Sequence, residues 1–169
     1  GHKHRHAVSA LLLMSIGSQL YAAVPAMNDA RVVDAARARD LAGVRALIAQ
    51  KADVNEPQPD GATALQWAAH WDDAAMAEAL LAAGADANRA NEYGVTPLEL
   101  ACGKGSAAMV TKLLGGKADP NKAQWNGTTP LMSCARTGSV EAVEALLKAG
   151  ANPKAKESRR GQTALMRAV

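Results

Sequence analysis

The sequence contains no phenylalanine, and aromatic residues make up only 3% of it. A core built from large aromatic side chains is therefore excluded. Hydrophobic residues nevertheless amount to 49% of the chain, so alanine and leucine must supply most of the apolar surface. These residues form helices readily, and their composition favours helices that pack closely through small side chains.

The chain also lacks a strong excess of charge of either sign. It has 19 basic and 16 acidic residues, a formal net charge of +3. Lys3 and Arg5 fall in the first 26 residues, which contain no acid, so the remainder has 17 basic against 16 acidic residues, or +1. Binding to nucleic acid or to an anionic membrane surface relies on concentrated positive charge. We therefore expect neither as a partner.

Signatures of catalysis and of cofactor binding are missing as well. Gly103-Lys104-Gly105-Ser106 is similar to part of a phosphate-binding loop, but Leu98 stands where the upstream glycine belongs and a glycine follows the lysine. His70 is the only histidine outside the first six residues, and with Asp72 and Asp73 nearby it is typical of a solvated surface. We expect no enzymatic activity, no cofactor and no metal.

The N-terminal segment has the pattern of an export signal. Residues 2–6 are basic, residues 7–16 are mostly apolar, and Ala22, Ala23 and Ala26 offer small residues for cleavage. No cysteine follows the apolar run, so lipid attachment there is excluded. We predict a signal peptide over residues 1–26 and an exported protein, periplasmic or secreted if the source is bacterial. An uncleaved membrane anchor is the alternative.

What the chain does contain is a repeat of 33 or 34 residues. A phrase recurs as Thr63-Ala64-Leu65, Thr96-Pro97-Leu98, Thr129-Pro130-Leu131 and Thr163-Ala164-Leu165. A second phrase precedes each copy, as Ala52-Asp53, Ala85-Asp86, Ala118-Asp119 and Ala151-Asn152. Repetition at this period indicates a stack of small units, each of which buries its apolar side only against its neighbours.

One unit shows how the pattern specifies two helices. Thr96 can cap a helix, and Pro97 suits the first helical position, where a missing N–H costs nothing. Gly105 interrupts that helix, since glycine accepts a positive φ. An apolar face at helical spacing follows, made of Met109, Val110, Leu113 and Leu114.

This pattern resembles the ankyrin repeat, which has this length and a Thr-Pro-Leu-His-x-Ala signature. The resemblance covers about residues 29–169. It implies an all-α solenoid of helix-turn-helix units with short β-turn tips, preceded by the signal segment. The units would be a capping repeat over residues 27–60, repeats over 61–93, 94–126 and 127–160, and a truncated repeat over 161–169. Because the chain stops within a first helix, we expect a fragment of a longer protein.

The sequence departs from the family pattern at several positions. The signature histidine is replaced by Gln66, Glu99, Met132 and Met166, so the hydrogen bonds of that histidine cannot be assumed. Lys51 and Lys117 stand where glycine ends the second helix in other units. A left-handed conformation at either lysine would cost about 1 kcal/mol. One extra residue lengthens the last turn.

The only cysteines, Cys102 and Cys134, are 32 residues apart, one short of the repeat. They should lie on equivalent helices of adjacent units. Neighbouring helix axes run about 8–10 Å apart, whereas a disulfide needs Cα atoms within about 7 Å. We therefore predict two small buried thiols.

The resemblance also implies where a partner binds. Partners of such stacks usually occupy the concave face, which consists of the tips and the exposed side of each first helix. The positions that match this face are His70, Trp71, Glu92, Tyr93, Lys104, Trp125, Asn126, Arg136, Arg159 and Arg160. Trp67 is expected in the core. Exposed Trp, Tyr and Arg often dominate binding energy, although Trp71, Tyr93 and Trp125 could instead pack on a neighbouring tip.

We therefore expect a monomeric, non-enzymatic scaffold that binds another protein. Two alternatives stay open. The repeats could be the targeting arm of an enzyme whose catalytic domain lies beyond residue 169. They could also form an inhibitor or immunity-type protein that blocks an active site. The fold does not choose among these, because function resides in a site.

Overall fold

The computed structural model describes residues 31–169, which form short helices and contain no β-strand. The predicted signal peptide lies outside these residues. The helices are α1 (Val32–Arg37), α2 (Leu41–Ala49), α3 (Ala64–Trp71), α4 (Ala74–Ala82), α5 (Pro97–Lys104), α6 (Ala107–Gly115), α7 (Pro130–Thr137), α8 (Val140–Lys148) and α9 (Ala164–Arg167).

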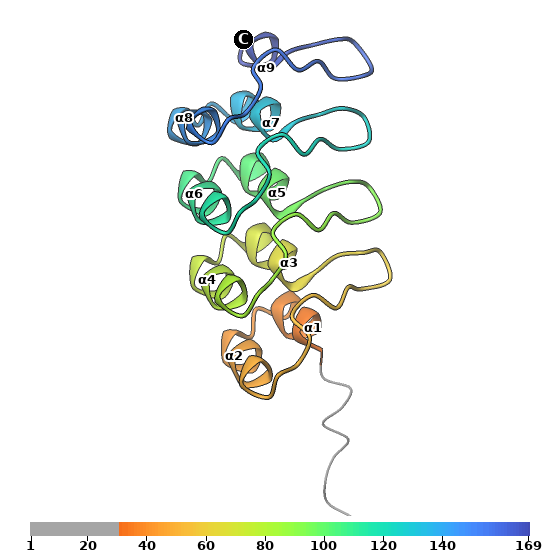
Figure 1. Cartoon of the computed structure of the whole chain (residues 1–169), viewed down its shortest axis with the longest axis vertical. Helices are drawn as coiled ribbons and strands as arrows, with labels where there is room; N and C mark the ends of the chain where they lie inside the picture. The colour runs from red at the N-terminus through yellow and green to blue at the C-terminus, as the bar shows by residue number, and fades with distance from the viewer. Residues whose placement is uncertain (1–30) are drawn as a thin grey trace, which may run out of the picture.

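The helices are arranged in two rows along one axis (Figure 1). The first helices α1, α3, α5, α7 and α9 contact one another in that order, and the second helices α2, α4, α6 and α8 form the other row. The loop between successive pairs projects to the side as a tip (Figure 1). The predicted all-helical repeat stack is confirmed.

The core runs through the whole stack as one continuous layer. Leu65, Leu98 and Leu131 occupy matching places in successive units and are 1%, 1% and 2% exposed. Leu165 belongs to the same series but is 77% exposed, because within the described chain no second helix follows α9 to cover it. The leucine series therefore marks core positions only where both rows of helices are present.

Local signals set the helix ends as predicted. The hydroxyl of Thr96 accepts a hydrogen bond from the backbone N–H of Glu99 at 3.2 Å, with Pro97 in the first turn. Gly105 ends α5 with a φ of 68°. Lys51 and Lys117 adopt positive φ values of 64° and 67°. Each lysine therefore carries the expected strain of about 1 kcal/mol.

A ladder of asparagines connects the units. The side-chain amide of Asn88 donates to the carbonyl oxygen of Lys117 at 2.9 Å, and its oxygen accepts from the backbone N–H of Asp119 at 2.6 Å. Asn55 and Asn121 make the same two bonds in the units before and after. These bonds satisfy the backbone groups of the next unit after its second helix. Lys154 holds the next position, where the series stops.

The four tips share one backbone pattern. In the first three, the N–H of Gln58, Asn91 or Gln124 donates to the carbonyl four residues later. In the last tip the N–H of Glu157 donates to the carbonyl of Gln162, five residues later. The predicted extra residue is therefore accommodated inside the turn. The side chain of Glu157 accepts the N–H groups of Arg159 and Arg160 at 2.7 and 2.5 Å, which holds the longer loop.

The two cysteines, predicted to be free thiols, form a disulfide between α5 and α7. The Cα atoms of Cys102 and Cys134 lie 4.4 Å apart. The prediction was wrong because it compared a distance between helix axes with a limit on Cα atoms. Cα atoms lie about 2.3 Å from the axis, so two that face each other across axes about 8–10 Å apart approach to about 3.4–5.4 Å. A disulfide fits that separation.

Candidate functional site

The ten residues predicted for the concave face lie on the tips and first helices. Eight of them are exposed, and His70 and Trp71 are half-buried. His70 and Trp71 end α3, and Lys104 and Arg136 lie in the last turns of α5 and α7. The remaining six are on tips: Glu92, Tyr93, Trp125, Asn126, Arg159 and Arg160.

The N-terminal half of this face carries an aromatic cluster, formed by Trp67, His70 and Trp71 with Arg37 and Arg39. The rings of Trp67 and Trp71 stack with centroids 5.9 Å apart, and His70 contacts both edge-on. The guanidinium of Arg37 lies 5.7 Å from the Trp67 ring centre, and that of Arg39 lies 5.2 Å from Trp71. These are cation–π distances. The cluster thus joins α1 and α3 into one apolar and cationic surface.

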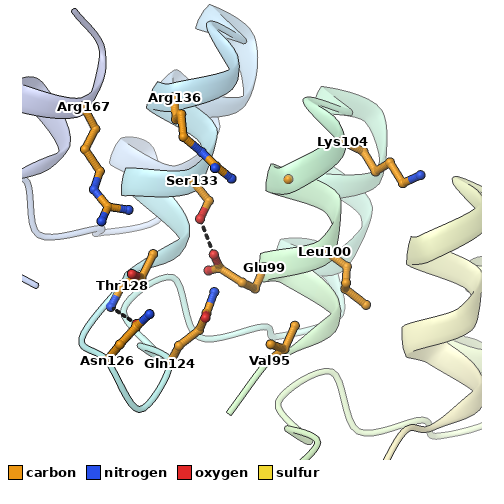
Figure 2. Close-up of a pocket in the computed structure, with 11 residues that line it drawn as sticks. Val95, Glu99, Leu100, Lys104, Gln124, Asn126, Thr128, Ser133, Arg136 and Arg167 are labelled. Carbon is orange, nitrogen blue, oxygen red and sulfur yellow. Dashed lines mark hydrogen bonds between the residues drawn. The ribbon is translucent and has the colours of Figure 1, made fainter. Parts of the chain in front are cut away.

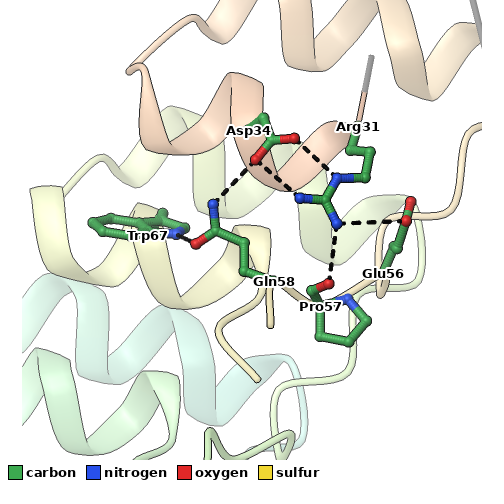
Figure 3. Close-up of polar contacts among 6 residues, drawn as sticks. All are labelled: Arg31, Asp34, Glu56, Pro57, Gln58 and Trp67. Carbon is green, nitrogen blue, oxygen red and sulfur yellow. Dashed lines mark hydrogen bonds and ion pairs between the residues drawn. The ribbon is translucent and has the colours of Figure 1, made fainter. Parts of the chain in front are cut away.

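Trp67 was expected in the core but is only half-buried. Its indole N–H donates to the side-chain oxygen of Gln58 at 3.0 Å, and the Gln58 amide donates to Asp34 at 3.1 Å (Figure 3). Arg31 pairs with Asp34 at 2.9 Å and donates to the carbonyl of Pro57 (Figure 3). Hydrogen bonds from Arg31 and then from Gln58 lower the pKa of Asp34. This network ties the divergent first unit to the first tip and orients the Trp67 ring.

Trp71 has a hydrogen-bond donor without a partner. Its indole N–H is buried and finds no acceptor among the described residues. A tryptophan N–H that is removed from water usually has a partner, and an unmet one costs about 1–3 kcal/mol. The Trp71 N–H is therefore an unmet donor enclosed within the aromatic cluster.

The aromatic residues of the tips are open to solvent. Tyr93 is 64% exposed and Trp125 is 77% exposed. Trp125 also lies against the preceding tip, since a Cβ atom on Gly94 would come 2.7 Å from Cδ1 of its ring. The carboxylate of Glu92 raises the pKa of the Tyr93 hydroxyl. Trp125 thus rests with one side on the neighbouring tip and exposes most of its surface; its role in recognition stays a prediction.

The C-terminal half of the face contains a hollow of about 410 Å³, which we call the Glu99 recess (Figure 2). It lies among α5, α7, α9 and the tip that precedes α7. Its polar lining consists mainly of Glu99, Lys104, Gln124, Asn126, Ser133, Arg136 and Arg167. Two predicted residues from first helices, Lys104 and Arg136, and one from a tip, Asn126, are therefore brought together.

Glu99 is the unusual group of this recess, since it is only 5% exposed. The Ser133 hydroxyl donates to its Oε1, whereas its Oε2 is buried and has no partner within hydrogen-bond geometry in residues 31–169. Burial raises the pKa of Glu99, although the side chains of Ser133 and Gln124 and the charges of Arg136 and Arg167 act in the opposite direction. A buried acceptor thus faces a mostly cationic hollow.

Gln66 shows what this position does elsewhere in the stack. One repeat earlier, its amide donates to the carbonyls of Arg89 and Val95 at 2.9 and 3.0 Å, and its oxygen accepts the N–H of Thr63 at 3.4 Å. Gln66 therefore ties its helix to the next tip. An ionised Glu99 has no proton to donate, so it cannot form the equivalent pair of bonds.

Sequence reasoning missed several residues of this surface. Arg37 and Arg39 lay in the divergent first unit, and Glu99 was seen only as a departure from the signature. Ser133 and Arg167 hold the same repeat position as Trp67, 66 and 100 residues later. Comparison of this repeat position in the later units would have placed both residues on the concave face.

The comparison with known families agrees with this geometry. A family described as ankyrin repeats (3 copies) matches residues 32–124 and 103–169, which together span nearly all the described residues. The chain belongs to the ankyrin-repeat family. No curated protein matches it in sequence.

Ankyrin repeats are generally protein–protein interaction modules, and proteins built from them are typically non-enzymatic scaffolds. Over residues 31–169, the helices are too short and too polar for any of them to cross a bilayer. A protein partner is thus the kind of ligand that the family suggests.

Proposed function

We propose that this protein is a non-enzymatic scaffold that binds a partner protein on the concave face of its ankyrin stack. The aromatic cluster carries this proposal. Two stacked indole rings, an edge-on imidazole and two guanidinium groups lie together on α3 and beside the end of α1. Such residues most often dominate interface energy, at about 2 kcal/mol or more each on truncation.

The tips extend the proposed surface beyond the cluster. Tyr93 and Trp125 expose most of their rings on successive tips. Backbone bonds hold neighbouring tips to each other, as between the Glu92 N–H and the Asp60 carbonyl at 3.0 Å. Aromatic side chains on a braced backbone lose little freedom on binding, which favours affinity.

We further propose that the protein works in an exported, oxidising compartment. The buried disulfide between Cys102 and Cys134 supports this, because cytosolic thiols are usually kept reduced. The predicted signal peptide over residues 1–26 points to the same compartment. A protein that keeps two free thiols when isolated from its native host would contradict this proposal.

The test is capture of the partner by the full chain from the exported fraction of the native host, followed by affinity measurement with the purified partner. Trp71→Ala with Trp125→Ala should weaken binding by at least about 100-fold. The matched control is Val140→Ala with Leu147→Ala, two apolar truncations on exposed positions of α8, which should leave binding within about twofold.

Circular dichroism and thermal melting separate binding from folding. Because Trp71 is half-buried, Trp125→Ala is the cleaner single variant. Unchanged affinity in the double tryptophan variant would refute the concave face as the binding surface. Capture of an enzyme whose activity the repeat stack inhibits would instead support the inhibitor alternative.

A further inference from the structure

We propose that the Glu99 recess binds the carboxylate of an acidic side chain on the partner, held between Arg136 and Arg167. This inference rests on the proposed function, because it names the chemistry of the partner that meets the C-terminal half of the same face. It adds a charged pocket to the aromatic surface at the other end.

The three cations of the recess lack anionic partners. Within residues 31–169 the ion pairs shorter than 4.0 Å involve only Arg31 and Lys112 as cations. Lys104, Arg136 and Arg167 come from three successive first helices, and all line the hollow. Figure 2 shows the Arg136 and Arg167 side chains reaching from their helices toward the Ser133–Glu99 pair. Guanidinium groups bind carboxylates through two parallel hydrogen bonds, which makes this class of ligand a geometric match.

Gly103 lines the hollow and contributes no side chain to it. His70 and Arg136 hold the same repeat position in the units before and after, so their side chains fill space that is open at Gly103. A Cβ atom on Gly103 would meet no heavy atom within 4 Å. The gap lies beside Lys104 and one repeat from Arg136. A larger side chain at Gly103 should therefore fill the recess without disturbing the fold.

Glu99 limits which anion enters and how tightly it binds. Its carboxyl is the one acidic group of the lining, against three cations. An ionised Glu99 repels an incoming carboxylate, so the present sequence holds its ligand less tightly than a neutral residue would. Glutamine at this position is compatible with the fold, because Gln66 occupies the equivalent place in the preceding unit. The variant Glu99→Gln should therefore bind a carboxylate more tightly.

The test uses hexaglutamate as the probe and the full chain, by calorimetric or NMR titration at low salt. Arg136→Gln should weaken binding at least about tenfold, and Gly103→Leu should do the same while the melting temperature is kept. Glu99→Gln should strengthen binding at least about threefold. Lys148→Gln removes the same charge from an exposed position on α8 and should change affinity less than about twofold.

Four outcomes would overturn the proposal. Equal weakening by Lys148→Gln would show attraction to net charge alone, and equal binding of inorganic phosphate would show an unselective anion site. Loss of binding in Glu99→Gln would mean that Glu99 favours the bound state and does not repel the carboxylate. The Trp71→Ala, Trp125→Ala variant should still bind hexaglutamate. If the natural partner ignores Arg136→Gln but is lost with the tryptophans, the recess proposal fails and the scaffold proposal stands.

Discussion

Reduction of the Cys102–Cys134 disulfide should destabilise the protein substantially. The bond closes a loop over a sequence separation of 32 residues and links the third and fourth helix pairs. The loss of chain entropy in the unfolded state gives a stabilisation of about 3–4 kcal/mol for a loop of this length. For a chain of this size, each kcal/mol changes the melting temperature by about 2–4 °C. We therefore expect the reduced protein to melt about 6–16 °C lower.

The assay is thermal and urea unfolding of the same preparation with and without a thiol reductant, at one pH. Cys102→Ala with Cys134→Ala is the control, since alanine occupies the equivalent places in other units, as at Ala68 and Ala69. This variant should melt near the reduced protein and should not respond to reductant. Hydrogen exchange should show the largest loss of protection in α5 and α7, because they lose their cross-link.

Two results would refute this reasoning. Titration of two free thiols in the unfolded, unreduced protein would show that no bond forms. Melting curves that differ by less than about 1 °C after complete reduction would show that packing of α5 on α7 already supplies the constraint, in conflict with the chain-entropy account.

Substitutions at three single residues give further predictions. Lys117→Gly should raise the free energy of unfolding by about 1 kcal/mol because it relieves the strain of a φ of 67°. Lys117→Ala keeps a Cβ atom and should not raise the free energy of unfolding. Urea unfolding measures both variants. Asn88→Ala removes two hydrogen bonds between units and should cost about 1–3 kcal/mol in the same assay; Asn88→Asp, which keeps the acceptor but loses the donor, should not restore stability. Burial raises the pKa of Glu99 above its unfolded value of 4.5. Its contribution to stability is therefore present below that value and is lost as pH rises through the folded pKa. Glu99→Gln should thus stabilise the protein more at pH 7 than at pH 4, and a constant difference across pH would contradict this.

The sequence predicts the stack well because its signals are local. Thr96 and Pro97 start a helix, Gly105 ends it, and these features depend on neighbours within one turn. The recess could not be predicted in the same way. Its defining contact joins Glu99 to Ser133 across 34 residues, and the departure from the signature at Glu99 does not show which residue of the next unit it meets. The prediction of two free thiols failed for a related reason. The repeat pattern places two helices side by side but does not give the separation of particular Cα atoms.

The contrast between constant and variable positions of the repeat explains why one stack carries two chemically different surfaces. Two sets of positions that touch the next unit keep their chemistry: Leu65, Leu98 and Leu131 fill the core, and the asparagine ladder repeats its bonds. The position of Trp67 touches the concave face, and there the series runs from tryptophan through leucine and serine to arginine. Because each unit contacts only its neighbours, this position changes without cost to the rest of the stack. The aromatic cluster and the Glu99 recess thus share one variable position of the repeat, which Trp67 holds at one end and Ser133 and Arg167 hold at the other. We expect a partner that spans both to place aromatic contacts at the first end and a carboxylate at the second.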